Sequence, residues 1–174
     1  MKQKVAIIGC GNLGEAILNG LLDSSLFLPE QLIATRRNTH LLKDFKARGV
    51  VVTNDNQQAV KEADLVLLAL KPHNILDITK GLQSSFDASR QTIVSLATGV
   101  SINNLQQVLP DGMPVFRAMP NTAAFVKESL TCICSNTRDP EREALVCSLF
   151  EGIGEIQLIE EQLMEAATVL GACG

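Results

Sequence analysis

Short apolar runs alternate along the chain with segments in which apolar residues recur at helical spacing. This alternation predicts strands followed by helices. The first run leads straight into a glycine-rich stretch, and the segment after it has the spacing of an amphipathic helix. The runs expected to form strands lie at 4–8, 31–35, 50–53, 63–70, 91–96, 114–119, 130–135 and 155–159.

Strands that alternate with helices build a parallel sheet with helices on both faces. We therefore predict an α/β fold, a Rossmann-like, doubly wound and mostly parallel sheet. Ser101 and Asp139 are expected to cap two of its helices. A last helix, from Glu160 to Leu170, has acidic residues at its positive end and an apolar second half. We expect that apolar end to contact a partner.

The first apolar run ends in three glycines, Gly9, Gly11 and Gly14, spaced G-x-G-x-x-G. A loop of this kind between a strand and a helix is typical of dinucleotide-binding sites. Gly9 allows the tight turn, Gly11 lets a pyrophosphate approach the backbone, and Gly14 lets the helix pack close to the strand. Amides at the start of the helix then face the phosphates. The alternative is a tight turn with a purely structural role.

The second apolar run ends at Thr35, followed by Arg36 and Arg37, where a site for NAD usually carries an acidic residue. A hydroxyl group and two guanidinium groups suit a 2′-phosphate, which brings negative charge and several acceptor oxygens. We therefore expect NADP(H) to be preferred over NAD(H). The alternative is a solvated basic turn ahead of the next helix.

Further candidate residues follow later apolar runs, at the sheet edge where open α/β folds bind ligands. Lys71 and Pro72 come after the run at 63–70, and an exposed loop lysine is an equal alternative for Lys71. A turn of small residues, Ala97 to Gly99, follows the next run. Asn56 is placed either to cap a short helix or to contact the adenine side of the cofactor.

Composition narrows the class of protein. With 174 residues, 46% of them hydrophobic, the chain suits one domain with a substantial core and is too short for a second full one. It has no run of 18 apolar residues and no signal-like start, so we expect a cytoplasmic protein without a membrane partner. A net charge of −4, with no Trp or Tyr to stack on bases, argues against nucleic acid as a partner.

The five cysteines form no C-x-x-C pair, so neither a disulfide framework nor a zinc site is expected, and no metal site is predicted. Cys132 and Cys134 are expected to share one face of a strand, and Cys147 to lie on a helix, all as core residues. Cys10 lies inside the glycine loop. It is either a small loop residue or a thiol whose oxidation obstructs the cofactor.

Five motifs occur in order along the chain: G-C-G-N-L-G at 9–14, T-R-R at 35–37, A-L-K-P at 69–72, A-T-G at 97–99 and R-A-M-P-N-T at 117–122. In this combination the chain resembles pyrroline-5-carboxylate reductase over nearly its whole length. The resemblance implies NAD(P)H-dependent reduction of 1-pyrroline-5-carboxylate, a cyclic imino acid, to L-proline. This is the last step of proline biosynthesis.

The resemblance, together with the glycine loop and the basic turn, assigns roles to individual residues. Those expected to bind the cofactor are Ile8, Gly9, Cys10, Gly11, Asn12, Leu13, Gly14, Thr35, Arg36, Arg37, Asn56, Ala69, Leu70, Lys71, Pro72, Ala97, Thr98 and Gly99. Those expected near the nicotinamide and the substrate entrance are Met119, Pro120 and Asn121. Hydride transfer needs no covalent nucleophile, and no catalytic residue is assigned.

The chain departs from the family in length and in two motifs. Family members continue into a helical domain that forms the dimer. We therefore expect a cofactor-binding domain at 1–159 and, at 160–174, the start of a helix leading to an absent C-terminal domain, through which the full-length protein forms a homodimer or higher oligomer. The isolated chain is expected to be inactive or weakly active. Ala123 stands where the family has Pro, and Gly171 to Gly174 replaces an S-G-S-G stretch, removing hydroxyl groups expected near the substrate.

Two other functions stay open at this point. One is an NADP-dependent reductase of the β-hydroxyacid dehydrogenase type, which shares this kind of first domain and depends on a downstream helical domain. The other is a nucleotide-binding module without turnover, either a sensor or an isolated domain. Assays with imine and hydroxyacid substrates separate the two reductases.

Overall fold

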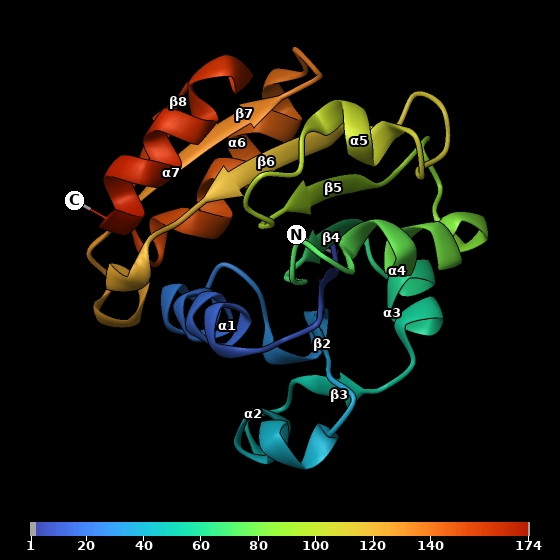
Figure 1. Cartoon of the computed structure of the whole chain (residues 1–174). Helices are drawn as coiled ribbons and strands as arrows, with labels where there is room; N and C mark the ends of the chain where they lie inside the picture. The colour runs from blue at the N-terminus through green and yellow to red at the C-terminus, as the bar shows by residue number, and fades with distance from the viewer. Residues whose placement is uncertain (1–2, 174) are drawn as a thin grey trace.

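The apolar runs form the strands of one sheet in the computed structural model, which describes residues 3–173. Within these residues, eight strands are hydrogen-bonded in the order β3-β2-β1-β4-β5-β6-β7-β8 (Figure 1). Strands β1 to β6 are parallel, β7 is antiparallel to β6, and β8 is parallel to β7. The strands are β1 Val5–Ile8, β2 Leu32–Thr35, β3 Val51–Thr53, β4 Leu65–Leu68, β5 Thr92–Ser95, β6 Val115–Met119, β7 Ser129–Ser135 and β8 Gly154–Leu158. The predicted mostly parallel sheet is confirmed.

Helices cover both faces of the sheet, so the doubly wound arrangement is confirmed as well (Figure 1). In β1, Val5 and Ile7 point into the core beneath α1, α2 and α6, whereas Ala6 and Ile8 point into the core beneath α3, α4, α5 and α7. Among residues 3–173, no helix is both long enough and apolar enough to cross a bilayer. The α-helices are α1 Asn12–Ser24, α2 Lys43–Ala47, α3 Asn56–Glu62, α4 Ile75–Gly81, α5 Ile102–Gln106, α6 Pro140–Glu151 and α7 Met164–Cys173. The 3-10 helices are η1 Pro29–Gln31, η2 Thr39–Leu42, η3 Gln83–Ser85, η4 Thr122–Val126 and η5 Glu161–Leu163.

Two of the predicted helix caps are confirmed and a third is wrong. The Ser101 hydroxyl accepts the Asn104 amide at 3.1 Å, and the Asp139 carboxylate accepts the Glu141 amide at 3.0 Å. At α3, however, the cap is Asp55, whose carboxylate accepts the Gln58 amide at 3.0 Å. The helix begins at Asn56 itself, one residue earlier than capping by Asn56 would require, so the Asn56 side chain does not serve that role.

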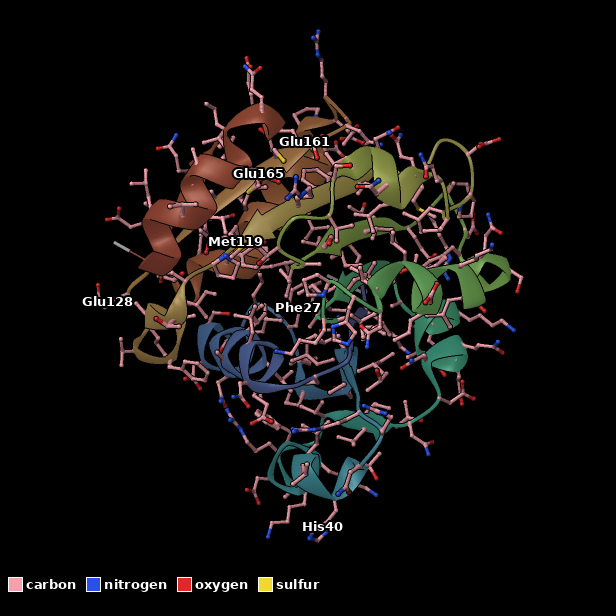
Figure 2. The ribbon with its side chains drawn as sticks, in the orientation of Figure 1. Phe27, His40, Met119, Glu128, Glu161 and Glu165 are labelled. Carbon is pink, nitrogen blue, oxygen red and sulfur yellow. The ribbon has the colours of Figure 1, made fainter. Side chains whose placement is uncertain are left out.

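The last predicted helix starts differently from the sequence expectation, because Glu161–Leu163 forms η5 and α7 begins only at Met164. Glu161, labelled in Figure 2, accepts the Ile102 amide at 2.7 Å and pairs with Arg117 Nη1 at 3.0 Å. The Arg117 side chain is buried in β6. The Glu161 carboxylate therefore ties η5 to β6 and to the start of α5, rather than serving the dipole of α7.

Helix α7 packs against β6 and β7 through its first turn, where Met164 is buried. Its apolar second half is exposed, with Leu170 at 74% of its full accessible surface. The expectation that this end has a partner stays a prediction, as does the division of the chain into two domains. The expectations for Gly174, and for the side chains of Ala172 and Cys173, lie outside what the structure describes.

Candidate functional site

The direction in which successive strands are added to the sheet reverses between β1 and β4. The chain builds β2 and β3 on one side of β1 and then returns to place β4 on the other side. The Ile8 carbonyl accepts the Ala69 amide at 2.9 Å, so the two strands stay joined at their carboxyl ends. Loops that leave a sheet in opposite directions open a crevice between them, and open α/β folds bind ligands at such points.

The glycine loop opens this crevice and is tied to the end of β2. Gly9 has φ +81°, and a Cβ there would lie 2.6 Å from Leu70 Cδ2, so only glycine fits without strain. The Gly9 amide donates to Thr35 Oγ1 at 3.1 Å, and the Cys10 amide donates to the Thr35 carbonyl at 2.7 Å. Thr35 is almost fully buried. Its side chain therefore holds the loop in place, and the basic residues after it face the crevice.

Gly14 and Gly11 differ in the space that surrounds each of them. A Cβ on Gly14 would lie 3.2 Å from Ile7 Cγ2 and from Cys10 Sγ, so packing of α1 against the strand fixes that glycine. A Cβ on Gly11 would meet only the Gly9 carbonyl oxygen, at 3.9 Å. The protein's own atoms do not demand a glycine there. The absent side chain instead leaves open space in the crevice, as a closely approaching pyrophosphate needs.

The start of α1 presents unpaired amides to this space. Gly11 is its N-cap and offers no side chain to cap it. The first intrahelical bond runs from the Glu15 amide to the Gly11 carbonyl at 2.8 Å. The amides of Asn12, Leu13 and Gly14 come before that bond and have no acceptor within the helix. Together with the helix dipole, they make this end of α1 suitable for a diphosphate.

Three connected compartments form the crevice. The first, called the basic compartment, has a volume of about 560 Å³ and lies beyond the ends of β2 and β3. It is lined by Gly9, Gly11, Thr35, Arg36, Arg37, Asn38, Asn54, Asn56, Ala69, Leu70, Lys71, Asn74 and Ile78. Arg36 Nη1 pairs with Glu15 Oε1 at 2.5 Å, which holds its guanidinium beside the first turn of α1.

The central compartment has a volume of about 560 Å³ and shares Gly11, Ala69, Leu70 and Lys71 with the basic compartment. It is lined by Gly11, Asn12, Leu13, Gly14, Ala69, Leu70, Lys71, Pro72, Leu96, Ala97, Thr98, Pro120, Asn121, Thr122 and Phe125. It therefore brings the start of α1 together with the ends of β4, β5 and β6.

The apolar compartment, of about 510 Å³, lies between α7 and the paired strands β6 and β7. It shares Pro120, Asn121 and Thr122 with the central compartment. It is lined by Met119, Pro120, Asn121, Thr122, Leu130, Cys132, Ala167, Thr168, Leu170 and Gly171. Met119, labelled in Figure 2, lies at the carboxyl end of β6, where the Thr98 hydroxyl approaches its sulfur at 3.7 Å.

Most of the residues assigned from the sequence line this crevice, with three exceptions. Ile8 and Cys10 are fully buried, so their side chains face the core. Gly99 lies in the turn beyond the lining of the central compartment. Several lining residues were not assigned from the sequence, among them Phe125 and Asn74, neither of which belongs to a recognisable motif. Asn74 Oδ1 is buried without a hydrogen-bond partner in the wall of the basic compartment, which leaves an acceptor there.

Cys10 should resist alkylation in the folded protein. Burial, reinforced by the nearby Glu15 carboxylate, raises the pKa of its thiol from 9.0 to about 12. The thiolate is the reactive form, and at pH 8 the fraction of Cys10 present as thiolate is about a thousandfold lower than for a thiol with the ordinary pKa. Iodoacetamide should therefore modify the partly exposed Cys147 well before Cys10, and urea should remove the difference. Peptide mass spectrometry measures both rates. Equal rates in the folded protein would contradict the buried placement.

Comparison with known proteins places the chain in a family. The model for "NADP oxidoreductase coenzyme F420-dependent" matches residues 4–99, more than half of the chain. Pyrroline-5-carboxylate reductase from Methanosarcina acetivorans is 32% identical over 99% of this chain and 64% of its own length. The structure of pyrroline-5-carboxylate reductase from Coxiella burnetii has a TM-score of 0.94 and 30% identity, over 100% of this chain and 65% of its own. The Plasmodium falciparum pyrroline carboxylate reductase with NADP bound has a TM-score of 0.85 and 23% identity, over 99% and 63% of the two chains.

The fold and the crevice define a Rossmann-like domain of the dinucleotide-binding oxidoreductase class. The chain belongs to the family of NADP oxidoreductases described as coenzyme F420-dependent. Its resemblance to pyrroline-5-carboxylate reductases, first indicated by the motifs, is confirmed over the whole chain. The chain spans just under two thirds of the length of the Methanosarcina acetivorans and Coxiella burnetii reductases.

Proposed function

We propose that this chain supplies the cofactor-binding domain for NAD(P)H-dependent reduction of 1-pyrroline-5-carboxylate to L-proline. One observation carries the proposal: a crevice that runs from a basic compartment, past unpaired amides of α1, to an apolar compartment. That order matches the phosphates and the nicotinamide of a dinucleotide followed by a small cyclic substrate. Relatives at 30% to 32% identity that are named for this reaction support it.

Each part of the crevice would act on a different part of the ligands. Amides of Asn12 and Leu13 would bind the diphosphate, and Arg36 would bind a 2′-phosphate. Pro120 and Asn121, shared by the central and apolar compartments, would set the distance between nicotinamide and substrate. A bound, reduced nicotinamide supplies hydride to the carbon of a cyclic C=N bond. The contribution of the protein is then binding and orientation rather than a covalent nucleophile.

The proposal is tested by binding and by turnover. The 174-residue chain should bind NADPH, measured by the change in nicotinamide emission, because the chain has no Trp or Tyr to interfere. It should show little turnover of pyrroline-5-carboxylate, since the matching reductases are longer than this chain by about a third of their own length. A full-length protein that reduces a β-hydroxyacid substrate but not the imine would overturn the proposed reaction. Failure of the chain to bind any dinucleotide would overturn the proposed domain.

Arg36→Ala should weaken the binding of NADPH but leave the affinity for NADH almost unchanged. A hydrogen bond to a charged group contributes about 1.5–3 kcal/mol, so the dissociation constant for NADPH should rise roughly 10- to 150-fold. Arg48→Ala is the matched control, because Arg48 is also an arginine in an ion pair but contacts Asn19 and Asp23 and lines none of the three compartments. Equal affinity of the wild type for the two cofactors would contradict the preference for NADP(H).

Two further proposals concern the full-length protein. We propose that it forms a homodimer or higher oligomer through sequence outside this chain, and that it is cytoplasmic. The exposed apolar half of α7, including Leu170, supports contact with further protein at that end of the sheet. Size-exclusion chromatography with light scattering on the full-length protein would test the assembly.

A further inference from the structure

Phe125 differs from the other aromatic residues of the chain in its exposure. All six aromatic side chains are phenylalanines, and all lie within the part of the chain that the structure describes. Five are buried in the two cores: Phe27, Phe45, Phe86, Phe116 and Phe150. Phe125 is 59% exposed. Among the described residues it is also the one phenylalanine that lines the crevice, where a ligand would cover the ring and gain from its burial.

The segment that carries Phe125 is held at both ends. The Asn121 side chain accepts the Ala123 amide at 3.1 Å, and the Asn121 amide donates to Ser129 Oγ at 3.1 Å. At the other end, Lys127 Nζ donates to Asp23 Oδ2 of α1 at 2.8 Å. These bonds hold η4, the connection from β6 to β7, beside α1 (Figure 1). Phe125 is therefore presented from an anchored loop.

The position of Phe125 in the crevice selects the part of the ligand that it would meet. It lines the central compartment together with Leu13 and Thr98. The arginines lie in the basic compartment, on the far side of Gly11. A dinucleotide with its adenosine half beside Arg36 and its diphosphate at α1 would thus extend its nicotinamide half toward Phe125.

We propose that Phe125 is a further cofactor-binding residue, whose ring packs against the nicotinamide half of the dinucleotide. The inference rests on the proposed function, since it assumes a dinucleotide in the crevice. The ring would shield one side of the nicotinamide half from water and add an aromatic contact that a small polar side chain cannot supply. Neighbouring Val126 is more exposed, at 70%, and does not line the compartment.

The test compares two ligands with three variants. Wild type, Phe125→Ser, Phe125→Tyr and the control Val126→Ser are titrated with NADPH and with adenosine 2′,5′-bisphosphate, which lacks the nicotinamide half. Phe125→Ser should raise the dissociation constant for NADPH about tenfold and reduce the change in nicotinamide emission. The dissociation constant for adenosine 2′,5′-bisphosphate should stay unchanged in this variant. Phe125→Tyr should restore NADPH binding, and Val126→Ser should match the wild type for both ligands.

Several results would overturn the inference. These are unchanged NADPH binding in Phe125→Ser, equal weakening of both ligands, or the same loss in Val126→Ser. The last two would show that the loop, rather than the ring, matters. The melting temperature of each variant is measured alongside, so that weaker binding of both ligands caused by unfolding is told apart from weaker binding by a folded variant. If the wild type binds neither ligand, the proposed function itself fails, and that outcome is distinct from the others.

Discussion

Gly11→Val should weaken dinucleotide binding by about a hundredfold while leaving the fold intact. The space around a Cβ at this position contains only the Gly9 carbonyl oxygen, at 3.9 Å, so the free protein accepts the larger side chain. The backbone dihedrals of Gly11, φ −98° and ψ −158°, are open to any residue. The isopropyl group would fill the space proposed for the diphosphate, and overpacking of this kind costs up to about 3 kcal/mol. Titration with NADPH and urea denaturation measure the two effects.

Gly14, three residues later, is packed against other atoms and provides a contrast with the open space at Gly11. Gly14→Val should lower the free energy of unfolding, because its Cβ already meets Ile7 and Cys10 at 3.2 Å. Gly81→Ala is the neutral control, since no atom lies within 4 Å of its Cβ position. If Gly11→Val unfolded the protein as readily as Gly14→Val, the open space at Gly11 would be misassigned. If it bound NADPH normally, the diphosphate would lie elsewhere.

Gly154→Ala should be among the most destabilising single substitutions in the chain. Gly154 begins β8 with φ +144°, and a Cβ there would lie 1.9 Å from the Ser129 carbonyl oxygen. Ser129 is its partner in the parallel ladder between β7 and β8, so relief of the collision requires the two strands to separate. We expect a loss of roughly 4 kcal/mol or more in the free energy of unfolding, measured by urea denaturation.

Gly112→Ala separates backbone strain from collision. Gly112 also has a positive φ, +74°, but no atom lies within 4 Å of its Cβ position. That variant should lose only about 1–2 kcal/mol, the cost of a left-handed conformation for alanine. A similar loss in both variants would mean that β8 moves aside easily, and the pairing at Ser129 would then contribute little to stability.

The strands could be predicted because a strand in a parallel sheet is covered on both faces. In the segment that became β4, the four residues Leu65 to Leu68 are all apolar and all buried. The glycine loop could be predicted because steric demands at Gly9 and Gly14 act over a few neighbouring residues. Helix starts depend on single residues. One residue decides whether Asp55 or Asn56 caps α3, and both residue types are good caps.

Features that depend on distant contacts could not be predicted. The carboxylate of Glu161 pairs with Arg117, 44 residues earlier, and no local pattern indicates that distance. The same holds for Arg36 and Glu15, which come together only because β2 lies beside β1. Phe125 went unnoticed for a related reason. A single apolar residue in a loop gives no periodicity, and its exposure follows from the path of η4.

The ion pair between Glu15 and Arg36 gives the crevice its own internal counterion. A 2′-phosphate bound at Arg36, as proposed, would meet a guanidinium that a carboxylate already neutralises, so binding would exchange one anionic partner for another or recruit both. Long-range attraction of the dinucleotide is weaker than two bare arginines would give, and dissolved salt has less charge to screen. The proposed selectivity for the 2′-phosphate would then depend on close fit more than on field strength, and a change in ionic strength would leave the choice of cofactor nearly unchanged.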